Sequence, residues 1–188
     1  MTVAPTTALL GVSGAGKSWL AARIVARRPE FVRLSAGRLL REALHTTGKA
    51  LRTAPSNDVL QNQNRLVEVF RKAREGQLDR PILLEAHAFI DNDRELVDVP
   101  VEVMRALGVD GLLVLVTSPE LIQARRAEDP DRRRPERTFE DLAHQQKYML
   151  AIARNYARQL PARMAVIQSG DVDGACRFLD QVRGSLPG

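Results

Sequence analysis

The feature that most constrains this chain is the segment Gly11-Val12-Ser13-Gly14-Ala15-Gly16-Lys17-Ser18 near its start. It fits the pattern G-x-x-x-x-G-K-[ST] without a mismatch. Its glycines permit a left-handed backbone and a close approach, so that successive N–H groups can converge on a phosphate chain. An apolar run, Thr7–Leu10, precedes the segment and a helical pattern follows it from about Lys17. The sequence therefore predicts a triphosphate-binding loop between a strand and a helix, and the alternative is a merely flexible turn.

The residue types in this loop indicate which ligands it takes. Lys17 is positioned to reach the β- and γ-phosphates, and the hydroxyl of Ser18 is a ligand for Mg²⁺. The positive end of the following helix dipole adds to the attraction for anions. We therefore expect ATP and Mg²⁺ as cofactors, with Lys17 also a catalytic residue. The predicted cofactor-binding residues in the loop are Gly11, Ser13, Gly14, Ala15, Gly16, Lys17 and Ser18.

Short apolar runs alternate with longer amphipathic segments along the rest of the chain. The runs predict strands at about 7–10, 31–34, 82–86, 111–116 and 164–167. The amphipathic segments predict helices at about 17–28, 36–44, 59–75, 101–107, from 118 onward, 138–159 and 172–182, with a loop over 45–57. Strands without polar alternation are buried on both faces, and their alternation with helices implies parallel crossovers. We expect an α/β fold with a parallel sheet between two layers of helices, formed by a single domain over residues 1–188.

Composition excludes several classes of protein and leaves the partner open. The 28 Lys and Arg residues exceed the 23 Asp and Glu residues by five, and 24 of the 28 are arginines. This balance is compatible with nucleic acid, an anionic membrane or a small phosphorylated ligand. The single cysteine, Cys176, excludes a disulfide framework and a cysteine-based zinc site. Because the first 16 residues carry glycines and no basic n-region, we expect no signal peptide, no membrane span and a cytoplasmic location.

Two arginines follow the second predicted strand. Arg38 and Arg41 are three residues apart on one predicted helix, which Ser35 is suited to cap. Kinases that phosphorylate a hydroxyl need a carboxylate to take its proton, and this segment has no acid before Glu42. An acceptor that is already a phosphate needs only cations to hold it. Arg38 and Arg41 are therefore predicted to bind the acceptor, and the alternative is that both are solvated surface residues.

The third predicted strand ends in Glu85-Ala86-His87. A carboxylate at this point would reach Mg²⁺ through water or the hydroxyl of Ser18, so Glu85 and Ser18 form the predicted metal site. The alternative is a structural carboxylate bonded to backbone amides. His87 is predicted to point into the cleft and contact the substrate, whereas His45 and His144 lack the spacing of a metal cluster.

Arginines concentrate between Gln123 and Arg137, where six of them accompany four acidic residues. This mixture argues against a plain nucleic-acid tract. Pro130 and Pro135 interrupt the helix and allow a hinge. The pattern is typical of a lid that closes over phosphates, and the alternative is a solvated charged loop.

These motifs, in this order, make the chain resemble a P-loop nucleoside monophosphate kinase, nearest to the archaeal-type adenylate kinases and their bacterial relatives. The motifs are the loop Gly11–Ser18, the strand end 84–90, Ser118-Pro119, the lid residues Arg125, Asp129, Arg132 and Arg134, and the segment 35–41, with Arg41 at the position that holds the acceptor phosphate. The resemblance implies a five-stranded sheet in the order 2-3-1-4-5. It also implies that Arg125 packs on the donor adenine and that Arg132 and Arg134 contact the transferring phosphates as catalytic residues.

The sequence thus predicts transfer of the γ-phosphoryl group of ATP to a nucleoside monophosphate. An acceptor-binding helical segment over about 35–76 and a lid over about 125–137 belong to this hypothesis. Two alternatives remain: a P-loop kinase for another small metabolite, and a nucleotide-binding regulator with an RNA or protein partner. We expect a small-molecule substrate and neither nucleic acid nor membrane as a partner.

Overall fold

Five parallel strands form the sheet that carries the predicted loop. In the computed structural model, which describes residues 3–129 and 135–184, they are β1 (Thr6–Leu10), β2 (Val32–Ser35), β3 (Ile82–Glu85), β6 (Val109–Val116) and β7 (Arg163–Gln168). Their order is β2-β3-β1-β6-β7. Since β6 and β7 are the fourth and fifth strands of this sheet, the expected order 2-3-1-4-5 is confirmed.

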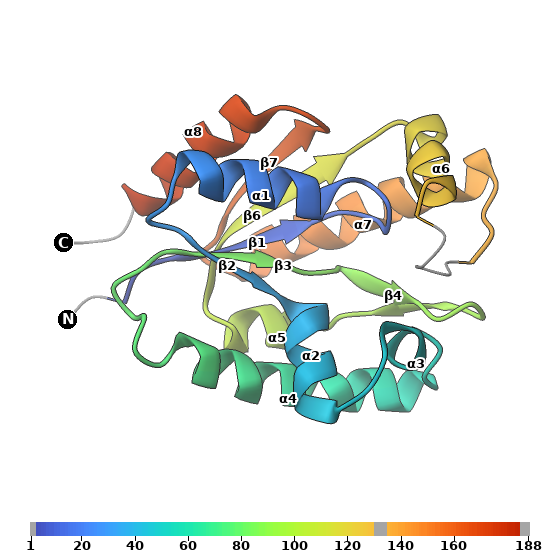
Figure 1. The fold of residues 1–188 in the computed structure, drawn as a ribbon, viewed down its shortest axis with the longest axis horizontal. Helices are drawn as coiled ribbons and strands as arrows, with labels where there is room; N and C mark the ends of the chain where they lie inside the picture. The colour runs from blue at the N-terminus through green and yellow to red at the C-terminus, as the bar shows by residue number, and fades with distance from the viewer. Residues whose placement is uncertain (1–2, 130–134, 185–188) are drawn as a thin grey trace.

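The middle of the sheet is apolar because helices cover both of its faces. Every residue of β1 and β3 is buried, and Ala8 of β1 pairs with Leu84 of β3 and Leu112 of β6. The helices are α1 (Lys17–Arg27), α2 (Ala36–Leu44), α3 (Gly48–Arg52), α4 (Ser56–Arg74), α5 (Val101–Ala106), α6 (Pro119–Ala127), α7 (Phe139–Gln159) and α8 (Val172–Arg183). Figure 1 shows α1 and α8 side by side on one side of the sheet and α7 on the other. The three-layer α/β architecture predicted from the sequence is therefore confirmed.

The sequence prediction was wrong for the segment 45–57, which is not a continuous loop. It contains α3, and α4 begins at Ser56 rather than at Val59. The hydroxyl of Thr47 accepts a hydrogen bond from the N–H of Ala50 at 3.1 Å and caps α3. A capped turn this short is stabilised by its neighbours more than by its own sequence, because helix nucleation is unfavourable.

A two-stranded antiparallel hairpin, β4 (Phe89–Asp91) and β5 (Leu96–Asp98), lies outside the main sheet. The sequence prediction has no element here. Its turn is closed by Asn92, whose side-chain oxygen accepts hydrogen bonds from the N–H groups of Arg94 and Glu95 at 3.1 and 2.9 Å. Asn and Asp tolerate the left-handed backbone of a turn, which Asp93 adopts with a φ of 76°, and this pair is the sequence signal for the hairpin.

The carboxyl ends of the strands point toward α6 and the hairpin, and both termini lie at the opposite end of the molecule (Figure 1). The loop between β1 and α1 therefore lies at the edge of the sheet where ligands bind in open α/β folds. None of the helices within the described ranges is both long and apolar enough to cross a membrane.

Candidate active site

One cavity of about 960 Å³ lies at this edge of the sheet. The loop Gly11–Ser18 forms one wall, and α2, α3 and α4 form the wall opposite. Residues at the end of β3, in β4, in and beside α5, in α6 and in α7 also line it. The cavity thus brings together segments that are far apart in the sequence, and its volume is in the range of small-molecule binding sites.

The loop has the backbone conformation that phosphate binding requires. Gly14 and Gly16 have φ angles of 90° and 98°, which a residue with a side chain rarely adopts. A Cβ atom on Gly16 would lie 2.8 Å from the guanidinium of Arg125 of α6, which would have to shift to make room for it. Helix α1 begins at Lys17, and the Lys17 ammonium donates hydrogen bonds to the carbonyls of Gly11 and Val12. The helix start and the ammonium give this wall a positive potential.

Ala15 is placed differently from the other predicted loop residues. It is fully buried and is not among the residues that line the cavity. Its N–H donates to the carbonyl of Val12 at 3.1 Å, and its own carbonyl accepts from Thr117 at 3.0 Å and from Arg125 at 2.8 Å. These backbone bonds hold the loop in place, and the part of Ala15 in cofactor binding stays a prediction.

Glu85 lies at the end of β3 and meets the loop. Its carboxylate is 6% exposed and accepts hydrogen bonds from the hydroxyl of Ser18 at 2.6 Å and from Arg33 at 2.7 Å. Both carboxylate oxygens are thus bonded to side chains. The bond with Ser18 is the contact that the sequence predicted. Mg²⁺ binds one or two carboxylate or hydroxyl oxygens together with phosphates and water. Ser18 and Glu85 fit that donor set, although no cluster of three or more His, Cys, Asp or Glu suited to a metal occurs among the described residues.

Of the two arginines predicted to bind the acceptor, only Arg41 lines the cavity. Its guanidinium lies beside Gly37 and Gly48, where an added Cβ atom would be 3.7 and 3.8 Å from its Nη1. In the described part of the chain Arg41 makes no ion pair with a carboxylate. Arg38 is outside the cavity, with a largely exposed side chain 3.7 Å from Glu42. The structure therefore does not bring Arg38 to the site. Its side chain lies beside Glu42, one turn later on α2.

The acceptor wall also contains a buried amide that the sequence analysis did not single out. Gln63 of α4 is 6% exposed and lines the cavity with the apolar residues Val59 and Leu66. Its Nε2 donates to the carbonyl of Val59 at 3.1 Å. This bond fixes the amide against its own helix and leaves the oxygen and a second N–H able to bond elsewhere. A glutamine on the apolar face of a helix is the only sequence signal for it.

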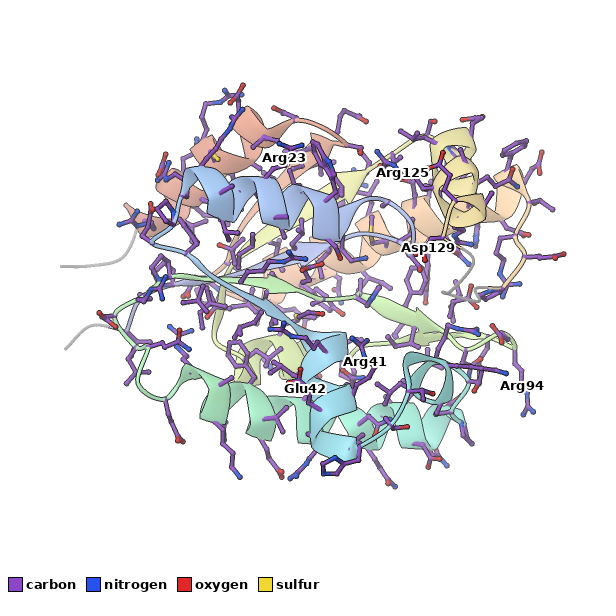
Figure 2. The ribbon with its side chains drawn as sticks, in the orientation of Figure 1. Arg23, Arg41, Glu42, Arg94, Arg125 and Asp129 are labelled. Carbon is purple, nitrogen blue, oxygen red and sulfur yellow. The ribbon has the colours of Figure 1, made fainter. Side chains whose placement is uncertain are left out.

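Two arginines of α6 donate hydrogen bonds to backbone carbonyls of the phosphate-binding loop. Arg125 donates to Ala15, and Arg126 donates to the carbonyl of Ser13 at 3.1 and 2.8 Å. Both line the cavity together with Asp129, and Figure 2 shows Arg125 and Asp129 near α6, across from Arg41. The sequence prediction assigned a role to Arg125 and none to Arg126. Arg132 and Arg134, predicted as catalytic residues of the lid, lie outside the described residues.

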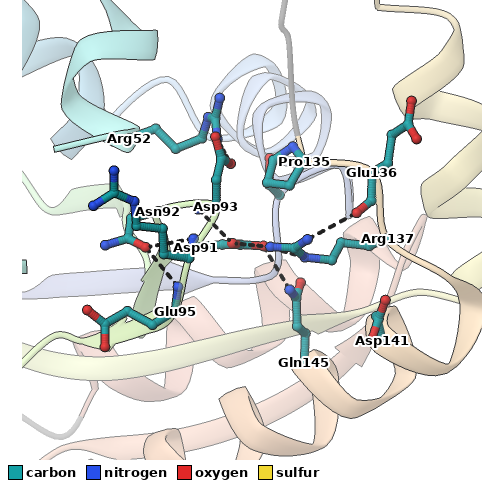
Figure 3. A network of polar contacts seen from close by, with 12 residues as sticks. Arg52, Asp91, Asn92, Asp93, Glu95, Pro135, Glu136, Arg137, Asp141 and Gln145 are labelled. Atoms are coloured by element: carbon teal, nitrogen blue, oxygen red, sulfur yellow. Dashed lines mark hydrogen bonds and ion pairs between the residues drawn. The ribbon is translucent and has the colours of Figure 1, made fainter. Parts of the chain in front are cut away.

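Asp91 of the hairpin is the centre of a polar network at the side of the cavity (Figure 3). Its carboxylate accepts two hydrogen bonds from Arg137, at 2.8 and 3.1 Å, and one from Gln145 at 2.9 Å. Burial raises the pKa of Asp91, but these bonds outweigh it and hold the pKa below its ordinary value. Asp93, two residues later, forms an ion pair with Arg52 of α3. The hairpin therefore links the acceptor wall to the start of α7.

His87 lines the cavity next to Glu85, as predicted. The roles of all these residues toward a substrate remain predictions, as do the segment 35–76 for the acceptor and the lid 125–137.

Comparison with known proteins places this site in a family. A family model described as AAA domain matches residues 10–143. An adenylate kinase of Pyrococcus horikoshii is 28% identical over 170 residues, which cover 88% of this chain and 87% of that protein. An adenylate kinase of Pyrococcus abyssi is 28% identical over 174 residues, with the same coverage.

Solved structures resemble the whole chain. The structure of shikimate kinase from Acinetobacter baumannii in complex with shikimate aligns with a TM-score of 0.64 at 15% identity, covering 99% of this chain and 97% of that one. A sugar kinase from a Janibacter species aligns with a TM-score of 0.55 at 16% identity, covering 98% and 99%. At these identities the likeness shows the fold, which is that of the P-loop kinases.

Proposed function

The chain belongs to the AAA domain family and has the P-loop kinase fold, and from this premise we propose that it transfers the γ-phosphoryl group of ATP to a nucleoside monophosphate. The loop wall supports the donor half of this proposal. The amides at the start of α1 and the ammonium of Lys17 lie together on one side of the cavity. A triphosphate bound there is held by fixed dipoles and one cation, which stabilise the charge of the transferring group.

Mg²⁺ bound between Ser18, Glu85 and the phosphates would supply charge neutralisation for the transfer. The chain's own contribution is orientation. Arg33 donates a hydrogen bond to one oxygen of Glu85, and the other oxygen accepts a hydrogen bond from the Ser18 hydroxyl, so that both side chains are fixed before a ligand binds. A preorganised pair of this kind costs no rearrangement during the reaction.

The observation that carries the choice of acceptor is the charge of the opposite wall. Arg41 and Lys49 line this wall, and neither has a carboxylate partner within residues 3–129 and 135–184. The carboxylates of Glu85 and Asp91 in the cavity are already bonded to neighbouring side chains. A hydroxyl acceptor needs a carboxylate to take its proton, whereas a phosphate acceptor needs cations. This balance favours a monophosphate over an alcohol.

Adenylate kinase is the name of the two sequence relatives, and it supports the same acceptor class. The structural neighbour solved with shikimate supports the second candidate, a kinase for a hydroxyl group of a small metabolite. Asp129 lines the cavity from the α6 side and adds a carboxylate to its lining.

A coupled assay for ADP formation separates the two candidates. The purified chain is supplied with ATP and Mg²⁺ and, in turn, with AMP, CMP, UMP, GMP, dCMP, shikimate and hexoses. We expect turnover with at least one monophosphate and none with the alcohols, and we expect Lys17→Ala to abolish it. Turnover with an alcohol alone would replace the proposal by the second candidate. No turnover above the Lys17→Ala level with any acceptor would refute both.

A further inference from the structure

Trp19 is a large apolar side chain in an exposed place. It follows Ser18 directly, in the first turn of α1, and is 48% exposed. The guanidinium carbon of Arg23, one turn later on α1, lies 5.4 Å from its ring centroid, a cation–π contact that orients the ring. An exposed aromatic ring beside a phosphate-binding loop offers a flat surface for a ligand.

A second, smaller hollow of about 390 Å³ begins at this ring. Gly16, Trp19, Arg125 and Gly170 line it, and the first three also line the main cavity, so that the two spaces meet. An added Cβ atom on Gly170 would find no atom within 4 Å, which leaves that side of the hollow open. None of the α2, α3 and α4 residues of the acceptor wall lines the hollow.

The direction of a bound triphosphate decides what occupies the hollow. For transfer, its γ-phosphate faces the acceptor wall that carries Arg41. Its nucleoside then extends to the other side of the loop, where α1, α6 and the turn between β7 and α8 surround the hollow. A nucleoside that extends in this direction would reach the hollow.

The polar groups beside the hollow are already engaged with one another. Arg125 donates to the carbonyl of Ala15 at 2.8 Å and to the Ser169 hydroxyl at 3.0 Å. The N–H of Ser169 donates to the carbonyl of Val116, and the carbonyl of Gly170 accepts from Val172, each at 2.9 Å. The lining includes no carboxylate or amide side chain that could hydrogen-bond to the edge of a base.

We propose that the donor base is held in this hollow by stacking on Trp19, and that the protein therefore uses purine and pyrimidine nucleoside triphosphates with little discrimination. Stacking on an aromatic ring discriminates little between bases, because every base has a π-face. A site that reads hydrogen bonds at the base edge can reject the wrong ligand by about 10⁴-fold. The described lining offers one charged side chain, Arg125, and its Nη1 and Nη2 already donate to Ala15 and Ser169. The inference rests on the proposed function, since it needs a triphosphate in the loop.

The test measures binding without an acceptor, so it is independent of turnover. Calorimetry with Mg²⁺ compares ATP, GTP, CTP, UTP and inorganic tripolyphosphate, which has no base. The variants are Trp19→Ala, Trp19→Phe, which keeps an aromatic ring, and the control Leu78→Ala. Leu78 is also 48% exposed but lies in the loop before β3, outside both cavities.

We expect wild-type affinities for the four nucleotides within about tenfold of each other. Trp19→Ala should weaken each nucleotide about tenfold and leave tripolyphosphate unchanged, with most of the loss restored in Trp19→Phe and none seen in Leu78→Ala. Equal effects of Trp19→Ala on nucleotides and tripolyphosphate would refute the stacking role. A preference for ATP over GTP above 100-fold would refute the broad donor range while the proposed function stands. Failure of wild-type protein to bind any triphosphate would refute the proposed function itself, and this inference with it.

Discussion

Arg41 and Arg38 are three residues apart on α2, yet only Arg41 lines the cavity, and this difference provides a matched pair of variants. Arg41→Gln should raise the KM for the acceptor about 30-fold, because a charge-assisted hydrogen bond contributes about 2 kcal/mol. The KM for ATP should not change. Arg38→Gln should leave both constants unaltered. Steady-state kinetics with each substrate varied in turn measures the effect, and equal effects of the two variants would contradict the placement of the acceptor.

Glu85 gives a second prediction at the level of single residues. In Glu85→Gln the side chain keeps its size but loses the charge that accepts from Ser18 and Arg33. We expect kcat to fall about 30-fold and the Mg²⁺ concentration for half-maximal activity to rise, since groups that orient a metal ligand typically contribute 10- to 100-fold.

Glu30→Gln is the control for this variant, because Glu30 forms ion pairs with Arg28 and Arg183 outside the cavity. Its kcat and Mg²⁺ dependence should match the wild type. An unchanged Mg²⁺ dependence in Glu85→Gln would show that its carboxylate is structural only.

Single residues differ in how far the sequence predicted their place. The loop from Gly11 to Ser18 was predicted as a unit, because its chemistry depends on neighbours in the chain. The contact of Ser18 with Glu85 was predicted from the strand end, although 67 positions separate the two residues. The positions of Arg126 and Gln63 in the cavity wall were not predicted, because their local sequence does not indicate which side of a helix will face a cavity.

Helix ends were the most predictable features of the elements. Ser35 accepts a hydrogen bond from the N–H of Arg38 at the start of α2, as its position in the sequence indicated. Ser118 and Thr138 likewise accept a hydrogen bond from a backbone N–H at the start of α6 and α7. Thr138 and Asp141 form a complete capping box. Caps are local interactions, so the sequence carries them. The short helix α3 and the hairpin were missed because they depend on contacts with distant segments, such as the ion pair of Arg52 with Asp93.

The packing of α8 on the sheet depends on a glycine in β6. A Cβ atom on Gly111 would lie 2.8 Å from Val182 of α8 and 2.9 Å from Thr7 of β1. Gly111→Ala should therefore lower the free energy of unfolding by about 2 kcal/mol, because the strand and helix must move apart. Urea denaturation measures this loss.

Gly184→Ala is the matched control, since its Cβ atom would lie 3.5 Å from the nearest atom and its φ is −72°. It should change stability by no more than about 0.5 kcal/mol. If Gly111→Ala were equally harmless, the close contact between α8 and β6 would be wrong.

At the scale of the whole molecule, the network around Asp91 joins the hairpin to α7 and should make stability depend on pH. The folded state holds the pKa of Asp91 below its ordinary value of 3.8. Its stabilisation is therefore complete above that value and is lost as the pH falls through the lowered pKa. Asp91→Asn should be about 2 kcal/mol less stable than wild type at pH 7, because Arg137 loses its charged partner. The difference should shrink below about pH 4.

Urea denaturation of both proteins at steps from pH 7 to pH 3 checks this prediction. Asp79→Asn, at an exposed carboxylate in the loop before β3, is the control and should follow the wild type at every pH. A constant difference between wild type and Asp91→Asn over the whole range would mean that the charge of Asp91 does not stabilise the fold.

The sequence by itself determined the phosphate-binding loop, the alternation of strands and helices, and hence the three-layer fold. Each of these follows from interactions between neighbours in the chain or from the periodic burial of apolar residues. Only the tertiary structure decided that Arg41 and not Arg38 faces the cavity, that Arg125 and Arg126 hold the loop from α6, and that Trp19 borders a separate hollow. These placements depend on how distant segments pack around one cavity. The local sequence does not indicate which side chains will face a partner that lies far along the chain.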